Sequence, residues 1–142
     1  MTATRLFFIP LIVLLMLSCG CRCPPRPPES RVRITEPAPN GVGGPDEMGT
    51  IRGVVSGVDP NDVKVLIYAH AGDRWWIQPL EDAPFTTVNS DGQWQARIHL
   101  GYEYAALLVH RSYSSSSPPK QPPDLPEVGG CIWAIEVKAG RT

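Results

Sequence analysis

The sequence carries little net charge and few groups suited to catalysis or metal binding. Its 142 residues include 13 basic and 14 acidic side chains, a formal charge of −1. A chain without basic excess has no electrostatic basis for binding nucleic acid or an anionic membrane surface. The sequence also lacks a metal-binding spacing, a phosphate-binding glycine loop and a nucleophile motif. We therefore expect no catalytic residues, no cofactor, no metal site and no nucleic-acid partner.

Histidines are also scarce, and each of the three ends a segment that is expected to be a strand. His70, His99 and His110 would form a zinc site only if these strand ends met in space. We interpret them as ordinary residues at strand ends.

Long hydrophobic runs are absent except near the N-terminus, where residues 6–17 are apolar apart from Pro10. This run is too short to span a bilayer as a mature helix, and with Arg5 before it the run is typical of a secretory signal. The segment that follows, MLSC, resembles the lipobox of bacterial lipoproteins, although Met16 stands where that family prefers leucine. The resemblance implies cleavage after Ser18 and an acyl anchor such as palmitate on Cys19. The protein would then be exported and held on the cell membrane or the outer membrane by its lipid. An ordinary cleaved signal is the alternative.

Cysteines are few, and export would leave three of them besides Cys19 in a compartment where disulfides form. We interpret Cys21 and Cys23 as part of a tether and Cys131 as a small buried side chain. A disulfide from Cys131 back to the tether is the other possibility.

Apolar residues are sparse between residues 19 and 48, where proline and glycine are concentrated. Such a segment buries too little surface to offset the entropy of ordering it. It predicts an extended tether that, at about 3.1 Å per residue, reaches up to roughly 90 Å from the membrane. The expected organisation is a signal peptide at 1–18, this tether at 19–48 and a folded domain at 49–142.

Amphipathic helices are missing from the folded part, which instead shows short β-branched runs separated by turn residues. The expected strands are 50–58, 63–70, 75–78, 93–99, 104–110 and 132–138, with a short one at 86–88. Segment 111–130 is polar and proline-rich, and predicts a flexible loop that crosses from one sheet to the other. The fold class is therefore all-β, a single antiparallel β-sandwich of the immunoglobulin or fibronectin III type.

Several segments of this part resemble a known kind of module: IRGVVSGVDPNDVKVLIYAH, DRWWIQP, DGQWQARIHLG, YAALLVHRSY and GGCIWAIEV. Together they are similar to a small β-sandwich accessory module found in exported bacterial proteins and beside carbohydrate-active domains. The resemblance covers residues 53–137 and rests on core aromatics and turns. It implies a binding or accessory role without catalytic residues.

Two adjacent tryptophans, Trp75 and Trp76, fall within an expected strand. Successive side chains of a strand leave opposite faces, so both cannot enter one core. Alternation sends Trp75, Ile77 and Pro79 inward and leaves Trp76 and Gln78 on the outer face.

The same alternation sends Trp94 inward and leaves Gln95 and Arg97 outside. If these two strands pair, Trp76, Gln78, Gln95 and Arg97 share one face. Sugar rings stack on indole, and their hydroxyls bond to amide and guanidinium groups. We therefore expect a membrane-anchored binding lipoprotein that contacts carbohydrate through this face. Alternatives are a protein-interaction or structural module of the cell envelope, or an indole that neighbouring side chains simply shield.

Overall fold

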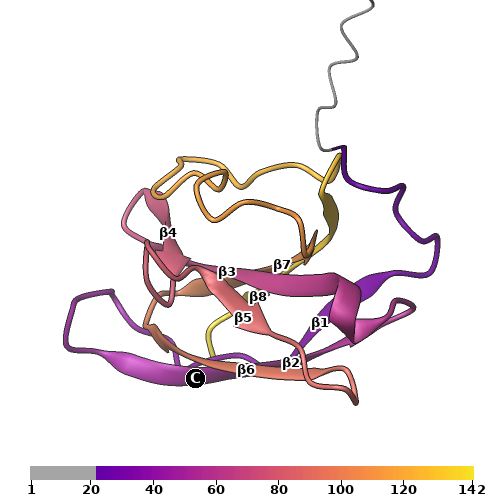
Figure 1. The fold of residues 1–142 in the computed structure, drawn as a ribbon. Helices are drawn as coiled ribbons and strands as arrows, with labels where there is room; N and C mark the ends of the chain where they lie inside the picture. Colours follow the sequence, from indigo (N-terminus) through magenta and orange to yellow (C-terminus); the bar gives the residue numbers. More distant parts are fainter. Residues whose placement is uncertain (1–21) are drawn as a thin grey trace, which may run out of the picture.

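The computed structural model describes residues 22–142, which form two antiparallel β-sheets packed face to face (Figure 1). The predicted signal peptide, Cys19 and Cys21 lie outside the described residues. One sheet has the order β1-β2-β6, and the other has the order β4-β3-β7-β8 with β5 paired to β3. Within residues 22–142, no helix is long and apolar enough to cross a membrane. The expectation of an all-β fold with two packed antiparallel sheets is confirmed.

The bounds of the strands agree closely with the runs read from the sequence. They are β1 (Arg31–Glu36), β2 (Met48–Ser56), β3 (Val63–Ala71), β4 (Arg74–Gln78), β5 (Phe85–Thr87), β6 (Gln93–His99), β7 (Glu103–His110) and β8 (Ile132–Ala139). A single turn of 3-10 helix, η1 (Pro60–Asp62), precedes β3.

Strand β1 was not expected, because it lies inside the segment assigned to the tether. Its sequence, RVRITE, buries Val32 and Ile34 and exposes the residues between them. That alternation gives β1 one core-facing side despite the proline-rich surroundings. The sheets therefore include residues from Arg31 onward, and the tether cannot extend to residue 48.

Backbone groups on the free edge of β1 bond to charged side chains of β8, which belongs to the other sheet. The backbone N–H of Ile34 donates to the carboxylate of Glu136. Lys138 Nζ donates to the backbone oxygen of Ile34 at 2.6 Å. Inward-pointing charged residues of this kind protect an edge strand from pairing with other chains. They also fix the two sheets together along this side.

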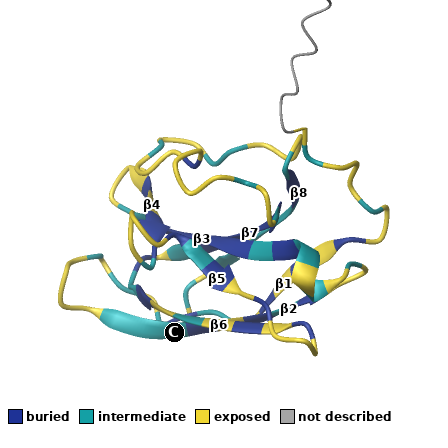
Figure 2. Ribbon diagram, viewed as in Figure 1, coloured by how far each residue is buried: buried dark blue, intermediate teal, exposed yellow. Residues whose placement is uncertain are grey.

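The five-stranded sheet is buried on both faces, which explains why β3 and β7 read as nearly continuous apolar runs. One face packs against the three-stranded sheet through residues such as Val65, Ile67 and Leu108. The other face carries a second apolar cluster that includes Tyr68 and Leu107. Figure 2 shows β3 and β7 as mostly buried.

Segment 111–130 covers this second face. It joins β7 to β8 within one sheet, so the expectation that it crosses between the sheets is wrong. Its backbone accepts hydrogen bonds from Trp75 N–H, through the oxygen of Pro122 at 3.0 Å, and from Ile77 N–H, through Lys120 at 3.1 Å. Tyr68 donates its hydroxyl to the oxygen of Pro119 at 2.7 Å, and burial raises the pKa of Tyr68. The segment thus acts as a layer of the fold rather than as a free flap.

A disulfide between Cys23 and Cys131 holds one end of this layer, with the two Cα atoms 5.2 Å apart. Cys131 is therefore not a free buried thiol, and of the two possibilities open from sequence, the link to the tether is the one formed. The bond fixes the chain before β1 to the start of β8.

Removing this cross-link should destabilise the domain strongly. The two cysteines are 108 residues apart, and closing a loop of that size restricts the unfolded chain by an amount worth about 5 kcal/mol. We expect the double variant Cys23→Ser/Cys131→Ser to lose free energy of unfolding of that order in urea titrations. The wild-type protein in reductant should then match the variant. Equal midpoints for the oxidised wild type and the double variant would contradict this role.

Candidate functional site

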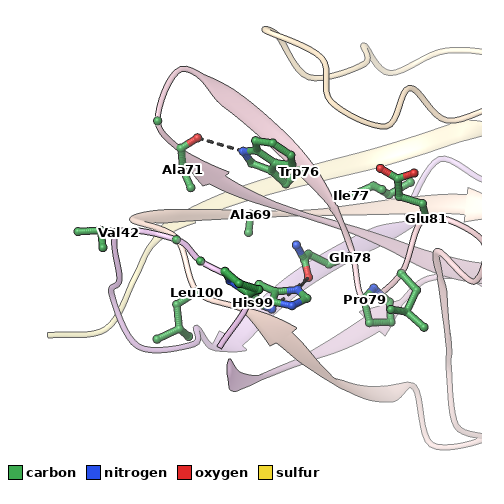
Figure 3. Close-up of a pocket in the computed structure, with 15 residues that line it drawn as sticks. Val42, Ala69, Ala71, Trp76, Ile77, Gln78, Pro79, Glu81, His99 and Leu100 are labelled. Carbon is green, nitrogen blue, oxygen red and sulfur yellow. Dashed lines mark hydrogen bonds between the residues drawn. The ribbon is translucent and has the colours of Figure 1, made fainter. Parts of the chain in front are cut away.

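The candidate site is a groove at one end of the sandwich, where the β3–β4 hairpin faces the end of β6 (Figure 3). It has a volume of about 540 Å³. Its lining comes from four places in the chain: residues 42–45, the β3–β4 hairpin, residues 78–81 from the last residue of β4 onward, and His99 with Leu100 at the end of β6. A groove of this size accommodates a small ligand or one or two side chains of a partner.

Trp75 and Trp76 leave opposite faces of β4, as alternation predicts. Trp75 is 7% exposed and Trp76 is 40% exposed. However, Trp75 packs beneath segment 111–130 in the second apolar cluster and not between the sheets. Trp76 lies opposite Ala69, on the face turned toward the other sheet. It is exposed because it reaches the open end of the space between the sheets.

The indole of Trp76 is held in place by its own hairpin. Its Nε1 donates to the backbone oxygen of Ala71 at 3.1 Å, the contact drawn as a dashed line in Figure 3. Because the N–H is already bonded, the indole offers a ligand mainly its apolar ring surface. A fixed ring of this kind loses little side-chain entropy when a ligand packs on it.

Gln78 is 4% exposed, so its expected position on a solvated face is wrong. Its Oε1 accepts the backbone N–H of His99 at 3.1 Å and lies 3.2 Å from His99 Nδ1. The side chain therefore connects β4 of one sheet to β6 of the other. Its amide nitrogen has no hydrogen-bond partner within residues 22–142, and Figure 3 shows it on the side of Gln78 toward Ala69 and Trp76. This nitrogen gives the groove a free donor that a ligand oxygen can use.

Gln95 and Arg97 do not join this site. The expected pairing of their strand with that of Trp76 is wrong, because β4 pairs with β3 while β6 pairs with β2 in the other sheet. Both side chains leave the outer face of β6, where Gln95 Oε1 accepts from Arg52 Nε at 3.2 Å. Of the four residues expected to bind sugar, the structure brings together only Trp76 and Gln78.

Two apolar side chains on loops, Val42 and Leu80, complete the rim of the groove. The sequence analysis did not identify them as site residues. Val42 is 87% exposed and Leu80 is 57% exposed. Each stands in a turn-rich stretch, GVGG and PLED, where an apolar residue cannot enter a strand core. That placement was the available signal, because an exposed apolar side chain gains nothing from folding alone.

The loops around the groove are acidic. Five exposed carboxylates lie on residues 42–47, the hairpin turn and residues 79–82: Asp46, Glu47, Asp73, Glu81 and Asp82. Two cations partly offset them: Arg74 Nε lies 4.0 Å from Asp73, and Lys120 Nζ lies 3.3 Å from Glu81. The remaining negative charge favours neutral or cationic ligands and disfavours anionic ones.

The three histidines do not converge. His70 Nδ1 lies 3.0 Å from Glu103, and His110 Nδ1 lies 2.7 Å from the hydroxyl of Ser112. The register of β3 and β7 places His70 opposite Glu103 and His110 opposite Val63, at opposite ends of these strands. Among the described residues, no three side chains of His, Cys, Asp or Glu are grouped so that they could hold a metal ion.

Gln78 and Gln95 provide a matched pair for testing the connection between the sheets. Replacing Gln78 by alanine leaves the His99 N–H without its acceptor, which should cost about 1–3 kcal/mol of unfolding free energy. Gln95→Ala removes an exposed contact and should change the unfolding free energy by no more than about 0.5 kcal/mol. Urea unfolding of the two variants measures both values. Equal losses would show that Gln78 does not link the sheets.

Comparison with known proteins adds no relative to this description. No protein-family model matches the chain, and neither the curated proteins nor the solved structures include a significant match. The groove is therefore the feature from which we infer a function.

Proposed function

We propose that this chain is a non-catalytic binding protein of the bacterial cell envelope, anchored by a lipid on Cys19, whose ligand occupies the groove beside Trp76. One observation carries the proposal: three exposed apolar side chains, Val42, Trp76 and Leu80, line the same groove. Apolar groups gathered around a concavity are typical of a binding site, whereas apolar groups scattered singly over a surface are ordinary. Kinship with small immunoglobulin-like accessory modules is part of the proposal, and the pair of packed sheets supports it.

The ligand that fits best is a peptide segment of another envelope protein. An aliphatic or aromatic side chain would pack on the indole of Trp76 between Val42 and Leu80. The amide nitrogen of Gln78 would bond to a backbone oxygen of the segment. Lysine or arginine residues flanking that side chain would meet the acidic loops, which gives specificity and faster association.

A neutral glycan is the second candidate, and the fixed indole of Trp76 favours it. A sugar ring would stack on the exposed indole surface and use the Gln78 amide nitrogen as a donor to one hydroxyl. Acidic polysaccharides are disfavoured by the carboxylates around the groove. The sugar candidate rests on fewer polar contacts than a face with Gln95 and Arg97 would provide.

A binding role also agrees with the state of the ionisable side chains in the groove. Glu81 and His99 line it. Glu81 is engaged by Lys120 at 3.3 Å, and His99 contacts Gln78 at 3.2 Å. Within the described part of the chain, neither is paired with a second group in the arrangement that general acid and base catalysis requires.

Replacing Trp76 by alanine should weaken ligand binding strongly without unfolding the domain. A central aromatic anchor typically contributes at least about 2 kcal/mol, so we expect the affinity to fall by roughly 30-fold or more. Arg97→Ala, on the outer face of the other sheet, is the matched control and should bind like the wild type. Fluorescence titration with a panel of basic, neutral and acidic apolar peptides, and with neutral and acidic glycans, provides the measurement.

The panel also separates the two candidates. Binding of basic apolar peptides supports the peptide-binding role, and binding of neutral glycans alone supports the second candidate. A panel in which no ligand binds, or in which Trp76→Ala binds as well as wild type, contradicts the proposed site.

A further inference from the structure

We infer that the Cys23–Cys131 disulfide attaches the lipid anchor to one end of the domain and leaves the groove at the opposite end, facing away from the anchoring membrane. The inference rests on the anchor at Cys19 that belongs to the proposed function. It specifies the orientation of the domain and the distance of the groove from the membrane, and so the side from which the ligand arrives.

The disulfide lies where β7 ends and β8 begins. His110 N–H donates to the backbone oxygen of Cys131 at 2.9 Å. His110 is also opposite Val63, the first residue of β3. Cys23 Sγ lies 3.3 Å from the hydroxyl of Ser112, two residues after β7. We call this the disulfide end of the domain.

The groove lies at the other end of the same strands. Trp76 is opposite Ala69, and Ala71 at the end of β3 accepts the indole N–H of Trp76. Strand β3 has nine residues, so its two ends are about 26 Å apart at roughly 3.3 Å per residue. Figure 1 shows the chain entering the described part on the right and the β3–β4 hairpin on the left. We call the end that carries the β3–β4 hairpin the groove end.

The disulfide also shortens the tether. Cys23 follows Cys19 by four residues (23 − 19), and four residues span at most about 14 Å. Without the cross-link, the first attachment to the sheets would be Arg31, twelve residues from Cys19 (31 − 19). Twelve residues span up to about 42 Å. The cross-link therefore replaces a long tether with a short one fixed to a single end of the domain.

Charge favours the same orientation. Three of the exposed carboxylates lie at the groove end: Asp73 in the β3–β4 hairpin, and Asp46 and Glu47 beside Leu100. Anionic headgroups repel them. Exposed Arg22 and Arg26 flank Cys23 and outnumber exposed Glu29, the one acidic residue of segment 22–30, so the same headgroups attract this segment weakly. The domain should therefore stand with its disulfide end toward the bilayer, and its groove about 40 Å from the headgroups at most. The ligand is then a molecule that approaches through the aqueous space beyond the domain. It is not a lipid of the anchoring membrane or a segment buried in it.

Energy transfer to the bilayer tests this orientation in the full lipidated protein. An azide-bearing amino acid is placed in turn at exposed Ser114, near the disulfide end, and at exposed Asp73, in the hairpin at the groove end. A clickable donor dye is attached to it. The protein is reconstituted in liposomes of phosphatidylethanolamine and phosphatidylglycerol that contain an acceptor-labelled lipid. We expect transfer from Ser114 to be at least about twofold more efficient than from Asp73, because Asp73 lies about 26 Å farther away.

In the double variant Cys23→Ser/Cys131→Ser, transfer from Ser114 should fall, because the tether lengthens up to about threefold. Circular dichroism measures whether the variant is folded, and the comparison of the two sites in the wild type does not depend on the variant. Equal transfer from Ser114 and Asp73 in the oxidised wild type overturns the inference.

Flotation with the same liposomes separates this inference from the anchor. Wild-type protein that does not float, or that floats equally well as Cys19→Ala, overturns both the anchor and the orientation. Protein that floats through Cys19 but shows equal transfer from both sites overturns the orientation alone. Ligand binding to the groove is measured independently and is unaffected by either result.

Discussion

The β4-β3-β7-β8 sheet is buried on both faces, and this double burial determines what packs around it. The three-stranded sheet covers one face, and segment 111–130 covers the other. The backbone of that segment bonds to β4, and the Cys23–Cys131 disulfide fixes its far end. Alternation along β4 therefore separates two apolar clusters rather than a core from solvent. Trp75 enters the closed cluster under the segment, and Trp76 reaches the open mouth of the other.

The groove follows from how the two sheets end. At the mouth, β4 and β6 are joined through the polar side chain of Gln78, which bonds to the backbone of His99. That bond uses the amide oxygen and leaves the amide nitrogen as a free donor on the groove side. Exposed Val42 and Leu80 then make the rim apolar, and the surrounding carboxylates select against anions. A stable domain thus carries a ligand site at one end and its attachment at the other.

Sequence patterns predicted the strands well, because each strand's alternation or continuous burial is a local property. They also separated Trp75 from Trp76 correctly. The pairing of the strands could not be predicted, because alternation shows which side chains share a face but not which strand lies alongside. Gln95 and Arg97 were therefore placed beside Trp76, although β6 belongs to the other sheet. Strand β1 was hidden among prolines because RVRITE is short, and the partner of Cys131 lies more than a hundred residues away.

Selective oxidation of tryptophan, followed by peptide mass analysis, is the measurement that tests whether Trp76, of the four tryptophans, is the exposed one. The chain has four tryptophans, and the three besides Trp76 are buried. Under limiting oxidant, we expect modification at Trp76 well before modification at Trp75, Trp94 or Trp133. Modification of Trp75 first, with Trp76 protected, would contradict the assignment of the two faces of β4 and the groove built on it.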